Sequence, residues 1–284
     1  MRFHSTRICT GIAIVGAAAL GLTACGGTAP DDDTAGDALP VNNAGSLTVC
    51  ISKNAYEPMY WNEGGTLTGF DVDAIEAIGE HLGLDVSFSE MAFDGLLPAL
   101  TSGRCDVLRS GLYVNEERAS QTDAIPYLQT GPALIIPAGN PLGLESTEDL
   151  SGISIAVQAA SANEQILRDI SDELEAEGLP GIELSVYPEL PETIAALTNG
   201  RVDATMETDV AAGQAAATLG DDYEMLGTIF PAETEFGMFM PRDSELTPHV
   251  LDATETLTGD GTFAEIAELY ELDPQRIVEP ELVR

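Results

Sequence analysis

Hydrophobic positions alternate in some segments of the chain, as in strands, and recur at helical spacing in others. Segments of the two kinds follow one another along the chain. They predict, in order, a strand, a helix, a strand, a helix and a strand, at 46–51, 69–84, 85–90, 93–103 and 105–108. Within the first helix Val72, Ile75 and Ile78 fall on one face, and Gly83 follows as a stop. This order is typical of a mostly parallel sheet covered by helices.

The same order starts again after residue 131. Strands are predicted at 152–157, 182–187 and 202–206, with helices between them at 161–178 and 191–200, and a last pair of helices is predicted at 245–257 and 262–272. We therefore expect an α/β fold of two doubly wound lobes joined by more than one crossing. Ligands of such folds sit in a cleft at the carboxyl ends of the parallel strands.

One short stretch occurs twice. The segment "LTSGRCDV" at 100–107 is matched by "LTNGRVDA" at 197–204, and each copy follows an apolar helical run and leads into a β-type run. Gly103 and Gly200 fall where a helix would end in a left-handed turn, which glycine adopts at little cost. The repeat predicts the unit helix, glycine stop, strand in both lobes.

The first 46 residues do not follow these patterns. Arg2 and Arg7 precede an uncharged apolar run that is too short for a comfortable membrane span, which indicates a secretory signal peptide over residues 1–24. The segment "LTAC", ending at Cys25, is similar to the bacterial lipobox, whose cysteine becomes lipid-modified; an ordinary signal peptide with a chance cysteine is the alternative. Residues 25–46 are small, polar and acidic, and they predict a flexible tether to a membrane anchor.

Charge and missing motifs exclude several classes of function. The 284 residues include 48 acidic and 11 basic side chains, for a formal net charge of −37 at pH 7, and such a surface repels nucleic acid. The chain has no nucleophile elbow, no zinc-protease helix, no phosphate-binding loop and no spaced carboxylate loop. We therefore expect no catalytic residues, no cofactor, no metal and no nucleic-acid partner.

Two of the four cysteines belong to the predicted exported fold. Cys9 lies in the predicted signal peptide and Cys25 is the predicted lipid site, whereas Cys50 and Cys105 lie at predicted strands of the first lobe. An oxidising compartment permits a disulfide between them. Two buried free thiols are the alternative, since pairing cannot be read from sequence.

Six segments occur in a characteristic order: "LTVCISKNAYEPMYWNEGGTLTGFDVDAIEAIGEHLGL", "FDGLLPALTSGRCDV", "SGLYVNEERA", "PYLQTG", "DLSGISIAVQ" and "NGRVDA". They resemble the landmarks of the family 3 extracellular solute-binding proteins, the receptors of polar amino-acid ABC importers, from residue 47 to about 272. The resemblance implies a periplasmic-binding-protein type II fold with a two-strand hinge. Its parts would be lobe 1 at 47–129 and 236–284, lobe 2 at 134–233, and the hinge at 130–133 and 234–235.

This resemblance also implies a function. The protein would be an extracytoplasmic lipoprotein, anchored to the cell membrane, that captures an amino acid or related small carboxylated solute between closing lobes and delivers it to an ABC permease. We expect it to work as a monomer. Two alternatives stay open: a cyclohexadienyl-type dehydratase of the same fold, with Glu57 or Glu207 as acid or base, and a ligand-sensing surface protein.

The family's ligand contacts transfer to positions near strand ends. Arg118 matches the arginine that clamps the ligand carboxylate, a task suited to a bidentate guanidinium. Ser110 and Gly111 would offer backbone groups from the same turn. Ser161 matches a carboxylate-binding hydroxyl at a helix start.

Other positions match the family less closely. Tyr56 and Phe93 fall where the family stacks aromatic rings on the ligand side chain, although either could be ordinary core. The family's amine-binding aspartate falls at Thr208, with Glu207 and Asp209 on either side.

Further departures lie near the predicted site. Tyr113 and Asn115 replace small hydroxyl residues, and Lys53 and Arg109 add cations at strand ends where the family is neutral. These two cations could contact the ligand or could only balance neighbouring acids. The departures together favour a ligand with more negative charge and no obligatory ammonium, or an amino-acid derivative recognised by the aromatic residues.

Overall fold

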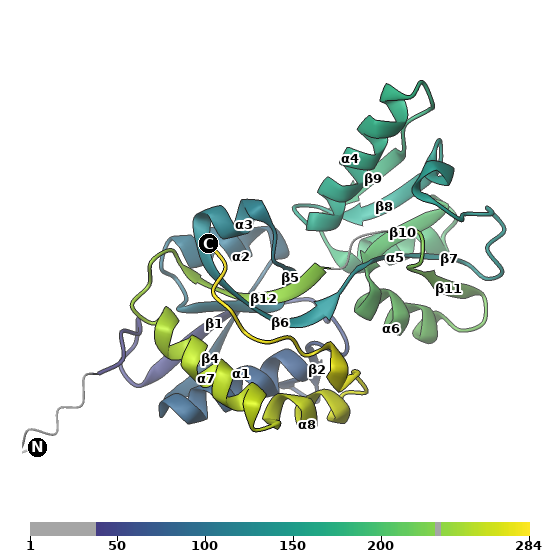
Figure 1. Ribbon diagram of the computed structural model, residues 1–284. Helices are drawn as coiled ribbons and strands as arrows, with labels where there is room; N and C mark the ends of the chain where they lie inside the picture. Colours follow the sequence, from purple (N-terminus) through teal and green to yellow (C-terminus); the bar gives the residue numbers. More distant parts are fainter. Residues whose placement is uncertain (1–37, 231–233) are drawn as a thin grey trace, which may run out of the picture. The chain divides into compact units, whose positions relative to one another are not determined.

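Two five-stranded sheets form the framework of the computed structural model, which describes residues 38–230 and 234–284 (Figure 1). The first sheet has the order β4-β1-β5-β12-β6, and these strands span Asp85–Met91, Ser46–Ser52, Val107–Tyr113, Thr234–Pro241 and Thr122–Thr130. The second has the order β11-β7-β10-β8-β9, and its strands span Tyr223–Leu226, Pro132–Pro137, Ala204–Thr208, Ser154–Gln158 and Glu183–Tyr187. A separate hairpin consists of β2 and β3, Trp61–Glu63 and Thr66–Thr68.

The two sheets follow one plan. β1 runs parallel to β4 and β5, and β8 runs parallel to β9 and β10. β12 pairs antiparallel with β5 and β6, and β7 pairs antiparallel with β10 and β11. The predicted doubly wound α/β architecture is confirmed, and each sheet also holds one strand that runs opposite to the other four, β12 in the first and β7 in the second. Along the chain, β7 follows β6 as the first strand of the second sheet, and β12 returns the chain to the first sheet.

Strands β6 and β12 were not predicted, and their sequences explain why. Pro126 interrupts β6 and Gly237 interrupts β12, and both residue types are signals against a strand interior. In the structure the two residues lie opposite each other, where the register of the pair shifts between Phe236 and Gly237. The irregularity therefore accommodates both residues at one place in the sheet.

The six predicted helices are present, and α3 and α6 are two further helices that the hydrophobic spacing did not predict. The first sheet is associated with α1, α2, α3, α7 and α8, which span Phe70–Leu82, Leu96–Thr101, Glu116–Gln121, Thr247–Gly259 and Thr262–Leu269. The second is associated with α4, α5 and α6, which span Ala162–Ala176, Leu190–Thr198 and Asp209–Leu219. Three short 3₁₀ helices, η1, η2 and η3, span Phe93–Gly95, Thr147–Leu150 and Pro274–Arg276. In Figure 1, α1, α7 and α8 lie together on one side of the first sheet and α2 lies on the other.

Strand β12 shows how alternation divides the core of the first sheet. Met238 and Met240 join one hydrophobic cluster, whereas Phe239 between them joins another that also contains Leu96 and Leu108. Successive side chains of a strand point to opposite faces, so a central strand supplies both layers. All three of these β12 side chains are fully buried.

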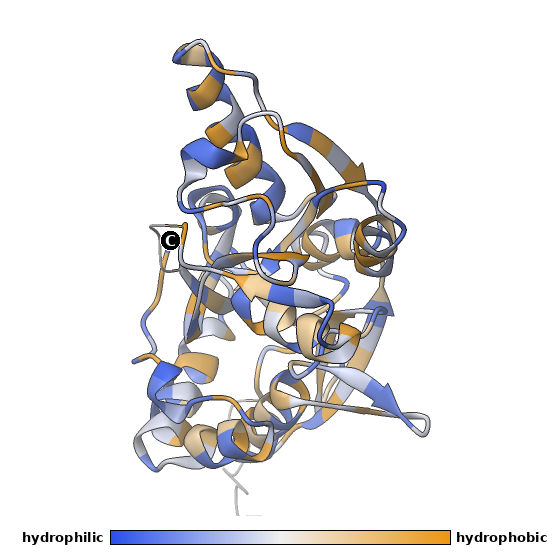
Figure 2. Cartoon of the chain, turned by 90° about the vertical axis from the view of Figure 1, so that its right-hand side faces the viewer, coloured by the Kyte–Doolittle hydropathy of each residue, from blue (hydrophilic) through white to orange (hydrophobic). Residues whose placement is uncertain are grey.

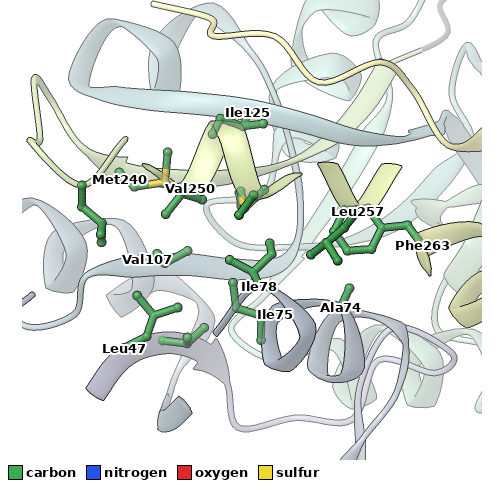
Figure 3. Close-up of a cluster of buried hydrophobic side chains, with 14 residues drawn as sticks. Leu47, Ala74, Ile75, Ile78, Val107, Ile125, Met240, Val250, Leu257 and Phe263 are labelled. Atoms are coloured by element: carbon green, nitrogen blue, oxygen red, sulfur yellow. The ribbon is translucent and has the colours of Figure 1, made fainter. Parts of the chain in front are cut away.

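The larger of these clusters fixes the C-terminal helices on the sheet. Figure 3 shows Val250 and Leu257 of α7 and Phe263 of α8 gathered above Ile75 and Ile78 of α1. Hydrophilic residues interrupt the hydrophobic ones along the helices (Figure 2), as expected for helices with one buried face.

The repeated sequence forms the same local structure in both sheets. Gly103 and Gly200 follow α2 and α5 in left-handed conformations, with φ of 73° and 65°. The aspartate of each copy then binds the strand beside it: the Asp106 carboxylate accepts the Thr48 backbone N–H of β1 at 2.8 Å, and Asp203 accepts the first N–H of β8 at 3.0 Å. The glycine reverses the chain and the aspartate aligns the next strand, which is a structural reason for the repeat.

The two cysteines of the described fold are joined. Cys50 in β1 and Cys105 just before β5 form a disulfide with an S–S distance of 2.02 Å. Both residues are fully buried in the hydrophobic cluster beside α2. The bond links neighbouring parallel segments that are 55 residues apart in the chain.

The predicted tether extends too far toward the fold. Val41 packs against the core of the first sheet, and the Asn42 backbone N–H donates to the Asp106 carboxylate at 2.7 Å. Residues 41–46 therefore belong to the folded unit, because a strand-aligning aspartate and an apolar contact hold them. The predicted signal peptide, Cys25 and residues 25–37 lie outside the described residues. Within the part that is described, no helix is long and apolar enough to cross a membrane.

Candidate functional site

A pocket at the strand ends is lined by residues from both sheets. The ends of β1 and β5 contribute from the first sheet, and the ends of β8 and β10 contribute from the second. Its cavity volume is about 40 Å³, and the cavity is partly open to solvent. All the predicted ligand-binding residues except Lys53 and Arg109 line it: Tyr56, Phe93, Ser110, Gly111, Tyr113, Arg118, Ser161 and Thr208.

Sequence reasoning missed several other lining residues. Asn54, Tyr60, Gln158, Asn163 and Leu190 also face the pocket. Gln158 is the last residue of β8, so the rule that ligands bind at the carboxyl ends of parallel strands would have found it. Tyr60 and Leu190 reach the pocket from a loop and a helix start whose paths no local pattern predicts.

Arg118 is the cation of the pocket. It lies in α3, whose N-cap Asn115 accepts the Arg118 backbone N–H at 2.9 Å, and its Nη1 donates to the Tyr113 carbonyl at 2.7 Å. Burial lowers the pKa of Arg118 to about 10, so the guanidinium stays charged at neutral pH. Among the residues described, no carboxylate pairs with it. Several of its donors are therefore available to a bound anion.

Aromatic rings form a continuous wall of the pocket. The Tyr56 ring stacks on Tyr60, with centroids 5.7 Å apart, and meets Phe236 edge-on at 6.4 Å. Tyr113 stacks on Phe236, with ring centroids 5.8 Å apart. The Tyr56 hydroxyl and Thr208 Oγ1 lie 2.6 Å apart, so this wall is hydrogen-bonded to the end of β10 in the second sheet.

Two hydroxyl residues begin helices at the pocket. Ser161 Oγ accepts the Glu164 N–H at 3.1 Å and donates to the Gln158 carbonyl at 2.7 Å, which caps α4. Thr208 Oγ1 accepts the Ala211 N–H at 3.2 Å and caps α6. Both helices therefore present positive dipole ends near the pocket, where an anionic group is favoured.

Glu207 is the carboxyl group of the pocket. Its side chain is only 5% exposed, and among the described residues no cation pairs with it. Burial raises the pKa of Glu207 to about 8, against a smaller lowering by the Thr208 backbone N–H. Asp209 is used elsewhere, since it accepts the Thr130 hydroxyl at 2.7 Å and pairs with Arg276 at 2.5 Å. Of the carboxylates around Thr208, only Glu207 lines the pocket.

The structure places Lys53 outside this pocket, contrary to its predicted ligand contact. Its half-exposed side chain lies 2.8 Å from Glu189 Oε1 at the start of α5, and Asn54 donates to the same carboxylate. Gln214 Nε2 of α6, beside the second sheet, also donates to Glu57 Oε2 in the loop after β1 at 3.3 Å, in an exposed contact. Lys53 therefore neutralises the charge of Glu189, because the carboxylate at the start of α5 lies within reach of the residue that follows β1.

Arg109 also does not reach the pocket, and the prediction that it contacts a ligand is wrong for a physical reason. It is completely buried, its Nε lies 3.0 Å from Asp71 Oδ1, and its guanidinium carbon lies 3.7 Å from the centre of the Tyr127 ring. Asp71 also accepts the Gly111 N–H at 2.9 Å. The pair thus fixes the end of β5, and the Gly111 N–H predicted to face a ligand is already used.

Metal-ligand geometry is not found at this site. No group of three or more His, Cys, Asp or Glu side chains within residues 38–230 and 234–284 could hold a metal ion.

Comparison with known proteins identifies the family. The model of the bacterial extracellular solute-binding proteins, family 3, matches residues 47–272, which include both sheets and every pocket residue. The chain belongs to this family. The match covers the same range that the sequence landmarks predicted, so the resemblance is confirmed.

Individual family 3 proteins are moderately similar to this chain. The L-cystine-binding protein TcyJ of Escherichia coli (strain K12) is 27% identical over 233 residues, which cover 81% of this chain and 84% of that protein. An ancestral arginine-binding protein, in structures bound to arginine and to glutamine, is 31% identical with a TM-score of 0.72, over 80% of this chain and 98% of that one. An ancestral amino acid-binding protein, described as a precursor of cyclohexadienyl dehydratase, is 25% identical with a TM-score of 0.68, over 80% and 95% of the two chains.

Proposed function

We propose that this family 3 protein is the substrate-binding lipoprotein of an ABC importer and that it captures an amino acid or a close carboxylated derivative. The observation that carries the proposal is Arg118, a buried cation without a carboxylate partner among the described residues, in a pocket lined from both sheets. A ligand carboxylate would complete the pairing, and a guanidinium matches it bidentately. The names of the similar binding proteins support the same ligand class.

Capture would proceed by closure of two lobes around the pocket. We take the lobes as residues 47–129 with 236–284, and 134–233, with hinges at 130–133 and 234–235. Tyr56 with Thr208, and Lys53 with Glu189, are contacts that closure would make and opening would break. A ligand that touches both lobes favours the closed state by the difference in its contacts with the two states.

Attachment to the outer face of the cell membrane completes the proposal. The lipobox-like segment ending at Cys25 supports a lipid anchor, and the acidic residues that follow support a tether. An anchored receptor would remain close to its permease, to which the closed form would deliver the ligand. The same closed form would also serve a surface sensor, so neighbouring genes for a permease and an ATPase would favour transport.

Thermal shift against a ligand panel tests the function. The soluble mature chain, residues 26–284, is heated with neutral, cationic and acidic amino acids, their deaminated counterparts and simple dicarboxylates. A ligand present at 100 times its dissociation constant should add about 2.7 kcal/mol to the free energy of unfolding. Stabilisation by an amino acid or a carboxylated derivative supports the proposal. The absence of stabilisation by any of these compounds contradicts it.

A dehydratase is the second candidate, favoured by one observation. Glu207 is buried in the pocket with its pKa raised to about 8, so an empty site holds a protonated acid at neutral pH. The ancestral neighbour described as a dehydratase precursor has the same fold. Recovery of each stabilising ligand unchanged after prolonged incubation supports binding alone, and its conversion would favour the enzyme.

Gly111 is expected to be required for binding. It adopts a φ of 58°, and a Cβ added there would lie 2.6 Å from the Tyr56 ring. Gly111→Ala should therefore displace the aromatic wall and weaken ligand affinity at least about tenfold, as expected for a misplaced binding group. Isothermal titration calorimetry with the best ligand of the panel measures this.

Gly200→Ala is the matched control for backbone strain. Gly200 has a similar φ of 65°, and a Cβ added there would meet no atom within 4 Å. This variant should cost roughly 1 kcal/mol of stability through strain and leave affinity unchanged. Equal loss of affinity in both variants would mean that strain, rather than the Tyr56 contact, controls the site.

A further inference from the structure

Two of the residues that line the pocket carry an acidic or basic side chain, and these two do not pair with each other. Arg118 and Glu207 are 6% and 5% exposed, both line the pocket, and they form no ion pair with each other. A buried charge without a partner is costly, so oppositely charged groups that lie close usually pair. Two such groups facing one cavity without pairing are suited to a ligand that carries both signs at separate atoms.

Two cations next to lining residues in the chain are already neutralised. Arg109 is paired with Asp71, and Lys53 with Glu189. No second cation therefore remains for an extra ligand carboxylate among the lining residues, and no second carboxylate remains for a ligand guanidinium. The other polar lining groups are hydroxyls and amides, among them Gln158.

We propose that the pocket selects a zwitterion with an uncharged side chain, and that Glu207 receives the ligand ammonium group and releases its own proton to solvent on binding. This inference rests on the proposed function and adds the ligand's charge class, the ammonium acceptor and a coupling to pH. Glu207 would take the part that the aspartate matching Thr208 plays in other family members.

The surroundings of Glu207 support the proton release. Burial raises the pKa values of Tyr56, Tyr60 and Tyr113, so the facing phenols are uncharged. On β7 the residue paired with Glu207 is Ala133, and on β8 the lining residue is the uncharged Gln158. Arg118 also lines the pocket but forms no ion pair with Glu207, and Asp209, two residues further along the chain, is paired with Arg276. Since Glu207 has no ion-pair partner within residues 38–230 and 234–284, the ligand's ammonium group would be the cation that holds it ionised.

The sign of the pH dependence follows directly. The carboxyl group of the empty pocket has its pKa raised to about 8, so it is mainly protonated at pH 6 and pH 7. Binding an ammonium group requires the carboxylate, so affinity rises with pH and levels off above about pH 8. For complete coupling to one proton the dissociation constant should fall roughly tenfold from pH 6 to pH 7 and about fivefold from pH 7 to pH 8.

Calorimetry on the soluble mature chain, residues 26–284, tests the coupling. Titrations with the best binder among L-glutamine, L-histidine, L-cystine, L-arginine and L-glutamate are run at pH 7 in phosphate and in Tris, whose ionisation enthalpies differ. The difference in apparent enthalpy should correspond to about 0.9 proton released per ligand. Binding with no proton release, or with the same affinity at pH 6 and pH 8, would overturn the role of Glu207 while leaving the proposed function intact.

Substitution of Glu207 provides a second test of the proton coupling. Glu207→Gln should remove both the proton release and the pH dependence, and it should weaken binding at pH 8 at least about tenfold, because a charged hydrogen bond is lost. Glu183→Gln, at the exposed start of β9 in the same sheet, is the control and should behave as the wild type. Wild-type affinity of Glu207→Gln at pH 8 would overturn the assignment. The wild-type proton count remains decisive if the variant does not fold.

The ligand series tests the charge class. L-Glutamine or L-histidine should bind more tightly than L-arginine and L-glutamate, and 4-carbamoylbutanoate, which is glutamine without its amine, should bind more weakly than glutamine. A preference for arginine or glutamate, or for the deaminated compound, would overturn the zwitterion assignment. Failure of every compound to bind would instead count against the proposed function.

Discussion

Replacing Arg109 with methionine is expected to lower the free energy of unfolding by about 3–5 kcal/mol, because it leaves the Asp71 carboxylate buried without its charge partner. Neither side chain of the pair is exposed, so water cannot compensate for the loss. The variant also removes the guanidinium that stacks on Tyr127 at 3.7 Å. Urea unfolding followed by circular dichroism measures the change.

A double variant separates lost charge pairing from lost packing. Asp71→Asn combined with Arg109→Met removes both charges and keeps an oxygen that can accept the Gly111 N–H. It should recover a large part of the stability lost in Arg109→Met, since a matched neutral pair avoids the isolated buried charge. A single variant that loses less than about 1 kcal/mol would show that this pair contributes little to the fold.

Replacing Arg118 with alanine is expected to weaken ligand affinity by about 2–5 kcal/mol, roughly 30-fold to several-thousand-fold, because a buried anion would lose its only cation in the pocket. Arg118→Lys should restore only part of the affinity, since an ammonium cannot form the bidentate fork. Calorimetry with the best ligand of the panel gives both values.

The unfolding curve separates binding from folding in this experiment. Arg118 makes one side-chain hydrogen bond to the Tyr113 carbonyl and no ion pair among the described residues, so its loss should affect stability much less than affinity. Arg104→Ala, at an exposed arginine of the repeated segment, is the control and should leave affinity unchanged. Wild-type affinity of Arg118→Ala would remove the carboxylate clamp from the proposed function.

An additional cation near a strand end can either contact a ligand or pair with a neighbouring carboxylate. Lys53, Arg109 and Arg118 all follow or end a predicted strand, and only the family resemblance separates Arg118 from the other two. In the structure Lys53 meets Glu189 and Arg109 meets Asp71, whereas Arg118 meets no carboxylate among the described residues. The earlier expectation of a ligand with additional negative charge loses its basis, because two of the three cations are already neutralised.

Local sequence patterns determined most of the order of elements and the repeated turn, and the family resemblance supplied eight of the pocket-lining residues. Helical spacing and glycine stops depend on near neighbours in the chain, so α1 and the turns at Gly103 and Gly200 were predictable. Strands β6 and β12 were not predicted, because Pro126 and Gly237 are accommodated through their position opposite each other, which no local pattern shows.

Only the tertiary structure decided which polar side chains face the pocket. Asp71 and Arg109 are 38 residues apart in the chain, and Tyr56 and Thr208 are 152 apart, so no local pattern records either contact. The choice of Glu207 over Asp209 as the pocket carboxyl likewise depends on Arg276, which pairs with Asp209 from near the end of the chain. The sequence by itself established the family and the kinds of groups at the site, and the packing of distant segments decided which charges remain unpaired, because charge pairing depends on distance in space.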